Sequence, residues 1–171
     1  AMALGRRPED GPPTAIAAVV CDGVSTVRRP ELASRTATAV ALAALLDGAE
    51  PGGPSEARML TAVHAAADAV GRLAPGSPDA PSCTLVAGLV DGSTVTVGWV
   101  GDSRAYWLAT GGATPTRQLT TDDTVAAQLV AAGMAEEEAS RVYNAHALSM
   151  WIGADAGERQ AVGPIGRELD R

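Results

Sequence analysis

Two apolar, β-branched runs joined by an Asp-Gly pair constrain the fold of this chain more than any other feature. The runs cover residues 82–90 and 93–100, with Asp91-Gly92 between them. Asp-Gly in this position predicts a tight hairpin, because a type I′ turn needs positive φ at both central residues. In the second run, Val and Trp alternate with Thr and Gly, which is the period of a half-buried strand.

Further breaks extend the hairpin into a meander. Gly101-Asp102-Ser103 precedes a third apolar run at residues 104–108, and Gly111-Gly112 predicts another turn. We therefore expect antiparallel strands throughout residues 82–119. Asp102 stands where one of these strands ends, so this acid is the first candidate for chemistry.

The part of the chain before the meander predicts one strand and two helices. Residues 14–21 are a continuous run of small and β-branched apolar residues, which favours a strand buried on both faces. The run ends at Asp22-Gly23, and an ionisable group directly after a buried strand must be solvated, paired or metal-bound. Apolar residues at three- and four-residue spacing predict helices over residues 30–46 and 55–73.

The part after the meander predicts two shorter helices. Residues 119–124 lead into a helix that ends near Ala132, and we expect Asp122 and Asp123 to cap it. Three glutamates begin a second short helix over residues 135–142, as the helix dipole favours. A strand, two helices and then a meander is an α+β order rather than βαβ alternation, and a layered sandwich is its natural solution.

Composition excludes several classes of function. The formal net charge of −7 opposes a nucleic-acid role, because such binding relies on clustered cations. No apolar run has the length of a membrane-spanning helix, so we expect no membrane role. Cys21 and Cys83 lack the spacing of a disulfide framework or metal site, which favours two buried reduced thiols in a cytoplasmic protein. The lack of Lys suggests high-GC bacterial coding.

Two acids share one context. Asp22 and Asp102 each follow an apolar strand and each adjoins a glycine, which lets a backbone approach a ligand closely. Oxygen ligands without nearby His or Cys favour Mg²⁺ or Mn²⁺ over Zn²⁺. The competing interpretation is a plain turn at each site. Trp151 is expected to pack rather than to serve as a substrate platform.

Four stretches, in this order, resemble motifs of the metal-dependent protein phosphatases, the type 2C serine/threonine phosphatase family. The Gly-Asp-Ser-Arg tetrad within the meander is the most specific of them, and the similarity extends through residues 129–153. The stretches are Cys21-Asp22-Gly23-Val24-Ser25, Ser82-Cys83-Thr84-Leu85, Val100-Gly101-Asp102-Ser103-Arg104-Ala105-Tyr106 and Leu119-Thr120-Thr121-Asp122-Asp123-Thr124.

The resemblance implies an α+β fold, a layered α-β-β-α sandwich with two antiparallel sheets flanked by helices. It also implies two Mg²⁺ or Mn²⁺ ions at one end, whose bridging water attacks the phosphorus of a phosphoserine or phosphothreonine. On this basis Asp22 would bridge the two ions, Gly23 would offer its carbonyl to one, and Asp102 would bind a third, weaker ion. Ser103 and Asp123 are expected beside these ligands, with Ser103 holding its turn.

The chain also departs from the family pattern. Val24-Ser25-Thr26 follow Gly23 where the family usually has two further glycines, so we expect this loop to be less flexible than in the family. The family's N-terminal Arg-x-x-Asn-x-Asp and its C-terminal Ser-Asp-Gly and Asp-Asn are absent. We therefore expect residues 1–171 to be one incomplete domain that does not hold both catalytic ions tightly.

The expected function is a metal-dependent phosphoserine/phosphothreonine protein phosphatase domain, inactive as this fragment. Its partners would be phosphorylated proteins and a serine/threonine kinase. The alternative is a phosphatase-like module that has lost metal chemistry and regulates by contact. An amidohydrolase with an N-terminal nucleophile shares the layered architecture, but Ala1 offers no nucleophile.

Overall fold

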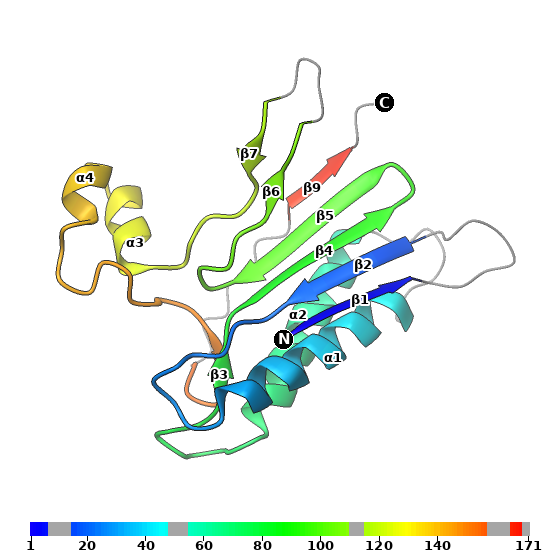
Figure 1. The fold of residues 1–171 in the computed structure, drawn as a ribbon, viewed down its shortest axis with the longest axis horizontal. Coiled ribbons are helices and arrows are strands. Elements are labelled where there is room, and N and C mark those ends of the chain that lie inside the picture. The colour runs from blue at the N-terminus through cyan, green and yellow to red at the C-terminus, as the bar shows by residue number, and fades with distance from the viewer. Residues whose placement is uncertain (7–14, 48–54, 110–114, 157–164, 169–171) are drawn as a thin grey trace, which may run out of the picture.

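A five-stranded antiparallel sheet forms the centre of the computed structural model (Figure 1), which describes residues 1–6, 15–47, 55–109, 115–156 and 165–168. Because neighbouring strands are antiparallel, β2 and β5 run in the same direction on either side of β4 and end at the same edge. In spatial order the strands are β1 (Met2–Arg6), β2 (Ala15–Val20), β4 (Leu85–Asp91), β5 (Thr94–Val100) and β9 (Ile165–Glu168).

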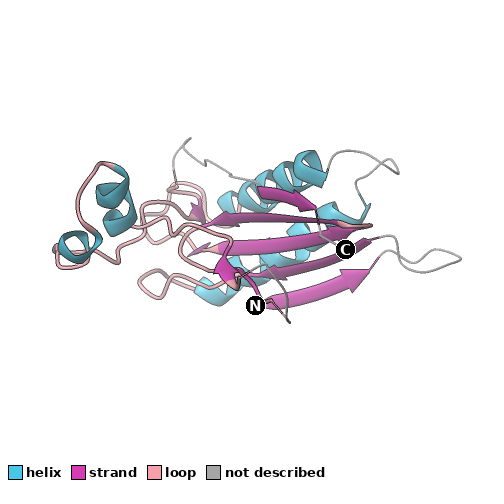
Figure 2. Ribbon diagram, turned by 90° about the horizontal axis from the view of Figure 1, so that it is seen from above, coloured by secondary structure: helices cyan, strands magenta, loops and turns pink. Residues whose placement is uncertain are grey.

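Helices α1 (Pro30–Asp47) and α2 (Ser55–Gly71) cover one face of this sheet (Figure 2), close to their predicted positions. Helix α1 packs on β1 and β2, and α2 packs on β4 and β5. Small residues permit the close approach. A Cβ atom at Gly98 would lie 2.5 Å from Met59 Cγ, so β5 has no side chain where α2 crosses it.

The other face of β2 is exposed. Burial alternates along the strand, with Ala17 and Val19 fully buried while Ile16 and Val20 are 43% and 41% exposed. The prediction of a strand buried on both faces was therefore wrong. Among the described residues, the long helices contact this sheet from one side only, so alternate residues of β2 point away from the core.

The predicted hairpin is present as β4 and β5, but its turn differs in type. Asp91 lies opposite Thr94, which makes Gly92 and Ser93 the central residues. Gly92 has a φ of +58°, and Ser93 does not have a positive φ. This matches a type II′ turn, which needs positive φ at its first central residue only.

The remaining strands form two short ladders. Strand β6 (Tyr106–Trp107) pairs with β7 (Arg117–Gln118) rather than with β5, so the expected continuous meander divides after β5; Gly111-Gly112 lies outside the described residues. Strand β3 (Ser82–Cys83) pairs with β8 (Ile152–Gly153).

Two short helices, α3 (Val125–Ala131) and α4 (Glu136–Ala139), lie away from the sheet (Figure 1). The α+β class, with antiparallel sheets and flanking helices, is confirmed. No helix in the described part of the chain combines the length and the apolar character needed to span a membrane.

Candidate functional site

The ends of β2 and β5 bring Asp22 and Asp102 to the same edge of the sheet, where β4 begins. We call this edge the rim. The Thr84 backbone N–H donates to the Asp22 carbonyl at 2.8 Å, which continues the β2–β4 pairing beyond the strands. Both carboxylate side chains are exposed, and no ion pair among the described residues engages either of them. The rim therefore presents two water-accessible carboxylates.

The side chain of Thr84 links the two turns that carry these acids. Its Oγ1 accepts a hydrogen bond from the Asp22 backbone N–H at 3.3 Å and shares another with Ser103 Oγ at 2.7 Å. Thr84 is 3% exposed, so water does not readily replace these contacts. Gly101 has a φ of +101°, and a Cβ atom there would lie 2.6 Å from Thr84 Cγ2. The tight turn before Asp102 therefore requires glycine.

Gly23 is also required by packing. A Cβ atom at this position would lie 2.6 Å from the carbonyl oxygen of Pro30, the first residue of α1. Gly23 also forms an antiparallel bridge with Cys83. The loop after Asp22 is thus held between the first residue of α1 and strand β3.

Asp123 holds the other side of the rim. Its Oδ2 accepts from the Gly101 backbone N–H at 2.8 Å, and its own N–H donates to the Gly101 carbonyl at 3.0 Å. Burial raises the pKa of the Asp123 carboxyl, the Gly101 hydrogen bond opposes that rise, and the charge of Asp122 adds to it. Asp123 therefore fixes the strand end that carries Asp102.

The expected cap of the following helix was wrong. Thr124 is the N-cap of α3, and its side chain accepts from the Ala127 N–H at 3.3 Å. Asp122 instead forms a bidentate ion pair with Arg104, with the shortest N–O distance 2.6 Å. Asp122 and Asp123 thus connect the segment before α3 to the turn after β5, because their partners Arg104 and Gly101 lie in that turn.

The donor set at the rim fits a hard divalent cation. Two exposed carboxylates and the Gly23 carbonyl are oxygen donors of the kind that Mg²⁺ and Mn²⁺ prefer. Among residues 1–6, 15–47, 55–109, 115–156 and 165–168, however, no group of three or more His, Cys, Asp or Glu side chains is placed to hold a metal. The rim therefore supplies part of a coordination sphere.

Cys21 and Cys83 flank the rim as buried free thiols. Their side chains are 1% and 0% exposed and hydrogen-bond to each other. That hydrogen bond and burial raise the pKa of Cys83, so this thiol stays protonated at neutral pH. Both cysteines are buried free thiols, as predicted.

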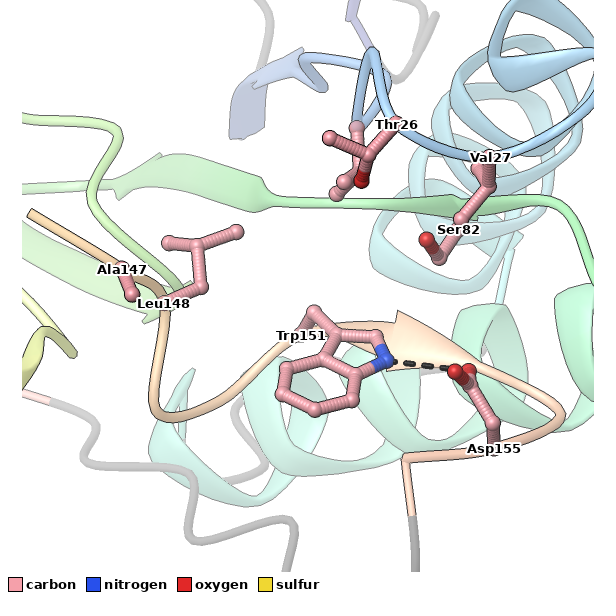
Figure 3. Close-up of a pocket in the computed structure, with 8 residues that line it drawn as sticks. Thr26, Val27, Ser82, Ala147, Leu148, Trp151 and Asp155 are labelled. Atoms are coloured by element: carbon pink, nitrogen blue, oxygen red, sulfur yellow. Dashed lines mark hydrogen bonds between the residues drawn. The ribbon is translucent and has the colours of Figure 1, made fainter. Parts of the chain in front are cut away.

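A cavity of about 340 Å³ adjoins the turn at Asp22 (Figure 3). Val24, Val27, Leu148 and Trp151 line it, and Trp151 lies across the space from Val27. The Trp151 indole N–H donates to Asp155 Oδ1 at 3.0 Å. The sequence assigned Trp151 to packing and did not predict this cavity, because its walls come from three segments that lie far apart in the sequence.

Two of three comparisons with known proteins found similar proteins. A family profile described as Protein phosphatase 2C matches residues 9–150. A search of curated protein sequences found no match.

Three solved structures illustrate the similarity. The Mycobacterium tuberculosis serine/threonine phosphatase PstP/Ppp shares 27% identity and a TM-score of 0.70, over 99% of this chain and 73% of that one. The catalytic domain of serine/threonine phosphatase PstP in complex with two manganese ions shares 28% identity and a TM-score of 0.66, over 99% and 72%. Staphylococcus aureus Stp1, at 22% identity and a TM-score of 0.76, supports the fold over 99% of this chain and 65% of that one.

Proposed function

The chain belongs to the protein phosphatase 2C family and forms a phosphatase-like domain, and from this premise we propose that it removes phosphate from phosphoserine or phosphothreonine in proteins. The observation that carries the proposal is the rim. Asp22 and Asp102 leave two strands at the same sheet edge, both side chains are exposed, and buried Thr84 connects their turns.

The proposed cofactors are Mn²⁺ or Mg²⁺ ions, two in a complete domain and a third, weaker one beside them. The two manganese ions of the PstP structure support this assignment. We assign Asp22 and the Gly23 carbonyl to the paired ions and Asp102 to the third. When bound, such ions lower the pKa of a coordinated water and neutralise phosphoryl oxygens.

The chain's own residues would orient these ligands. Thr84 holds the backbone of Asp22 and the side chain of Ser103, and Asp123 holds the backbone of Gly101. These contacts fix both turns while leaving the two carboxylates open to water and to an incoming phosphoryl group. Ser103 and Asp123 are therefore positioning residues in this proposal.

The proposal extends to the setting of the domain. Residues 1–171 would form a single, incomplete phosphatase domain that acts in the cytoplasm on phosphorylated proteins, opposite a serine/threonine kinase. The net charge of −7 supports a function without nucleic acid, and we propose none with membranes.

A catalytically inactive binding module is the competing function. It is favoured by the absence, among the described residues, of any group of three metal-ligating side chains. In that case the chain would recognise its partner by contact, without releasing phosphate.

Two measurements separate these functions. Calorimetric titration of this chain with Mn²⁺ should give weak binding that Asp22→Asn removes, while Asp79→Asn, a change at another exposed acid, leaves it intact. The full-length gene product should release phosphate from a phosphothreonine peptide in the presence of Mn²⁺. No release with Mn²⁺ supplied would favour the binding module. Two tight sites in this chain would contradict its assignment as an incomplete centre.

A further inference from the structure

We infer that the cavity beside the rim is a specificity pocket for an arginine side chain of the substrate, close in sequence to its phosphoresidue. The inference rests on the proposed function, because it needs the phosphoryl group to be bound at the rim. It adds a substrate preference, which neither the family match nor the rim geometry supplies.

The position of the cavity is the first argument. Val24 is the residue after Gly23, and its N–H donates to the Ser82 carbonyl at 3.0 Å, which fixes it as a wall of the cavity. Consecutive Cα atoms are about 3.8 Å apart, so the cavity opens within a few residue lengths of the rim. A peptide with its phosphoresidue at the rim would therefore carry a neighbouring side chain past this opening.

The walls of the cavity suit a long side chain with an apolar stem. Val24, Val27 and Leu148 surround the space, and the half-buried Trp151 lies across from Val27 (Figure 3). Aliphatic walls bury methylene groups, and an indole face attracts a guanidinium group. Its volume of about 340 Å³ accommodates a side chain of this size.

The charge of the cavity selects a cation over an apolar residue. Asp155 is the charged residue of the lining, it is exposed, and none of the ion pairs among the described residues includes it. Its Oδ1 accepts from the Trp151 indole, which holds the carboxylate at the edge of the ring (Figure 3). An arginine guanidinium stacked on the Trp151 indole would thus lie within reach of the Asp155 carboxylate. The paired N–H donors of arginine match the two oxygens of a carboxylate.

Peptide binding tests the inference directly. The probes are phosphothreonine peptides in an alanine background, each with either arginine or citrulline at one of the three positions on each side. Citrulline keeps the shape of arginine and removes its charge. In Mn²⁺ buffer we expect arginine to bind about threefold to tenfold more tightly than citrulline in at least one register, the size of an exposed ion pair plus a cation–π contact.

Matched variants assign that preference to the cavity. Asp155→Asn and Trp151→Phe should each lower the arginine-to-citrulline ratio, and Asp155→Asn combined with Trp151→Ala should bring it to near one. Asp79→Asn and Trp107→Phe, which change the same residue types outside the cavity, should leave it unchanged. A ratio of one in every register of the unmodified chain, or tighter binding of a leucine peptide than of the arginine peptide, would overturn the inference.

The same titrations keep the failure of the pocket apart from the failure of the proposed function. Mn²⁺-dependent phosphopeptide binding that Asp22→Asn removes, with no preference for arginine, overturns the pocket alone. A preference for arginine that needs neither Mn²⁺ nor the phosphate overturns the placement of the phosphoryl group at the rim. No measurable binding of any peptide at millimolar concentration counts against both.

Discussion

Replacing Thr84 with valine removes one hydroxyl from beneath the rim while keeping the outline of the side chain. That hydroxyl accepts from the Asp22 N–H at 3.3 Å and shares a hydrogen bond with Ser103 Oγ at 2.7 Å. With the side chain 3% exposed, the valine methyl group would leave both former partners facing an apolar surface. The change therefore tests whether the two acidic turns are held as one unit.

The expected loss of stability follows from these contacts. Leaving a buried polar group without its partner costs about 1–3 kcal/mol. The Asp22 contact is long, and Ser103 is only half-buried, so we expect the lower part of that range, about 1–2 kcal/mol. For a domain of this size each kcal/mol lowers the melting temperature by roughly 2–4 °C, which gives a decrease of about 2–8 °C.

Thermal unfolding and Mn²⁺ titration together provide the assay. Thr61→Val is the matched control, because the Thr61 hydroxyl is exposed on α2 and donates to the Ala57 carbonyl at 2.9 Å within its own helix. We expect Thr84→Val to weaken Mn²⁺ binding and Thr61→Val to leave it unchanged. Ser103→Ala combined with Thr84→Val should cost less than the sum of the single changes. A melting temperature like that of the control, or unchanged Mn²⁺ affinity, would refute the linkage.

Three further changes test other parts of the structure. Gly23→Ala should destabilise the fold by about 1–3 kcal/mol in urea unfolding, because its Cβ would lie 2.6 Å from the Pro30 carbonyl. Asp91→Ala should cost about 3 kcal/mol in the same assay, because Arg58, only 8% exposed, would lose its carboxylate partner at 2.7 Å. Burial raises the pKa of Asp123, so the folded state binds its proton more tightly than the unfolded state, and stability attributable to this group falls as pH rises above about 4. Asp123→Asn keeps an acceptor oxygen and should flatten that decline in unfolding free energy.

Each of these changes has a comparison within the chain. Gly71→Ala should be neutral or slightly stabilising, because a Cβ atom there meets nothing within 4 Å. Asp79→Ala removes an exposed acid and should change stability by less than about 0.5 kcal/mol. Equal losses at Gly23 and Gly71, or at Asp91 and Asp79, would contradict the packing and ion-pair arguments. A pH profile that Asp123→Asn leaves unaltered would contradict the assignment to that carboxyl.

Local sequence patterns predicted most of the secondary structure, because turn residues and hydrophobic spacing depend on a few neighbouring residues. The glycine in Asp91-Gly92 and the β-branched flanks were sufficient for the hairpin, but the turn type depends on which residues pair across it. The observed pairing of Asp91 with Thr94 shifts the loop by one residue, so positive φ falls on Gly92 alone. Likewise, an unbroken apolar run could not show that Ile16 and Val20 face away from the core.

The positions of the two candidate acids could be predicted because they depend on topology and not on side-chain detail. Asp22 and Asp102 reach one edge because β2 and β5 run in the same direction on either side of β4. Asp123 was misassigned because a helix cap is a local signal, whereas its carboxylate binds the N–H of Gly101, a distant residue. Thr124, one residue later, satisfies the cap instead.

Metal binding and stability should be coupled at the rim, since the same turns that would hold Mn²⁺ also close the central sheet. A ligand that binds only the folded state stabilises it by RT ln(1 + [L]/Kd), about 1.4 kcal/mol when the free concentration is ten times Kd. That is the size of the loss expected for Thr84→Val, so Mn²⁺ at sufficient concentration should restore most of its melting temperature. The same Mn²⁺ should fail to stabilise Asp22→Asn. Equal stabilisation of both variants would place the bound ion away from Asp22 and would remove the support for a metal centre at this edge.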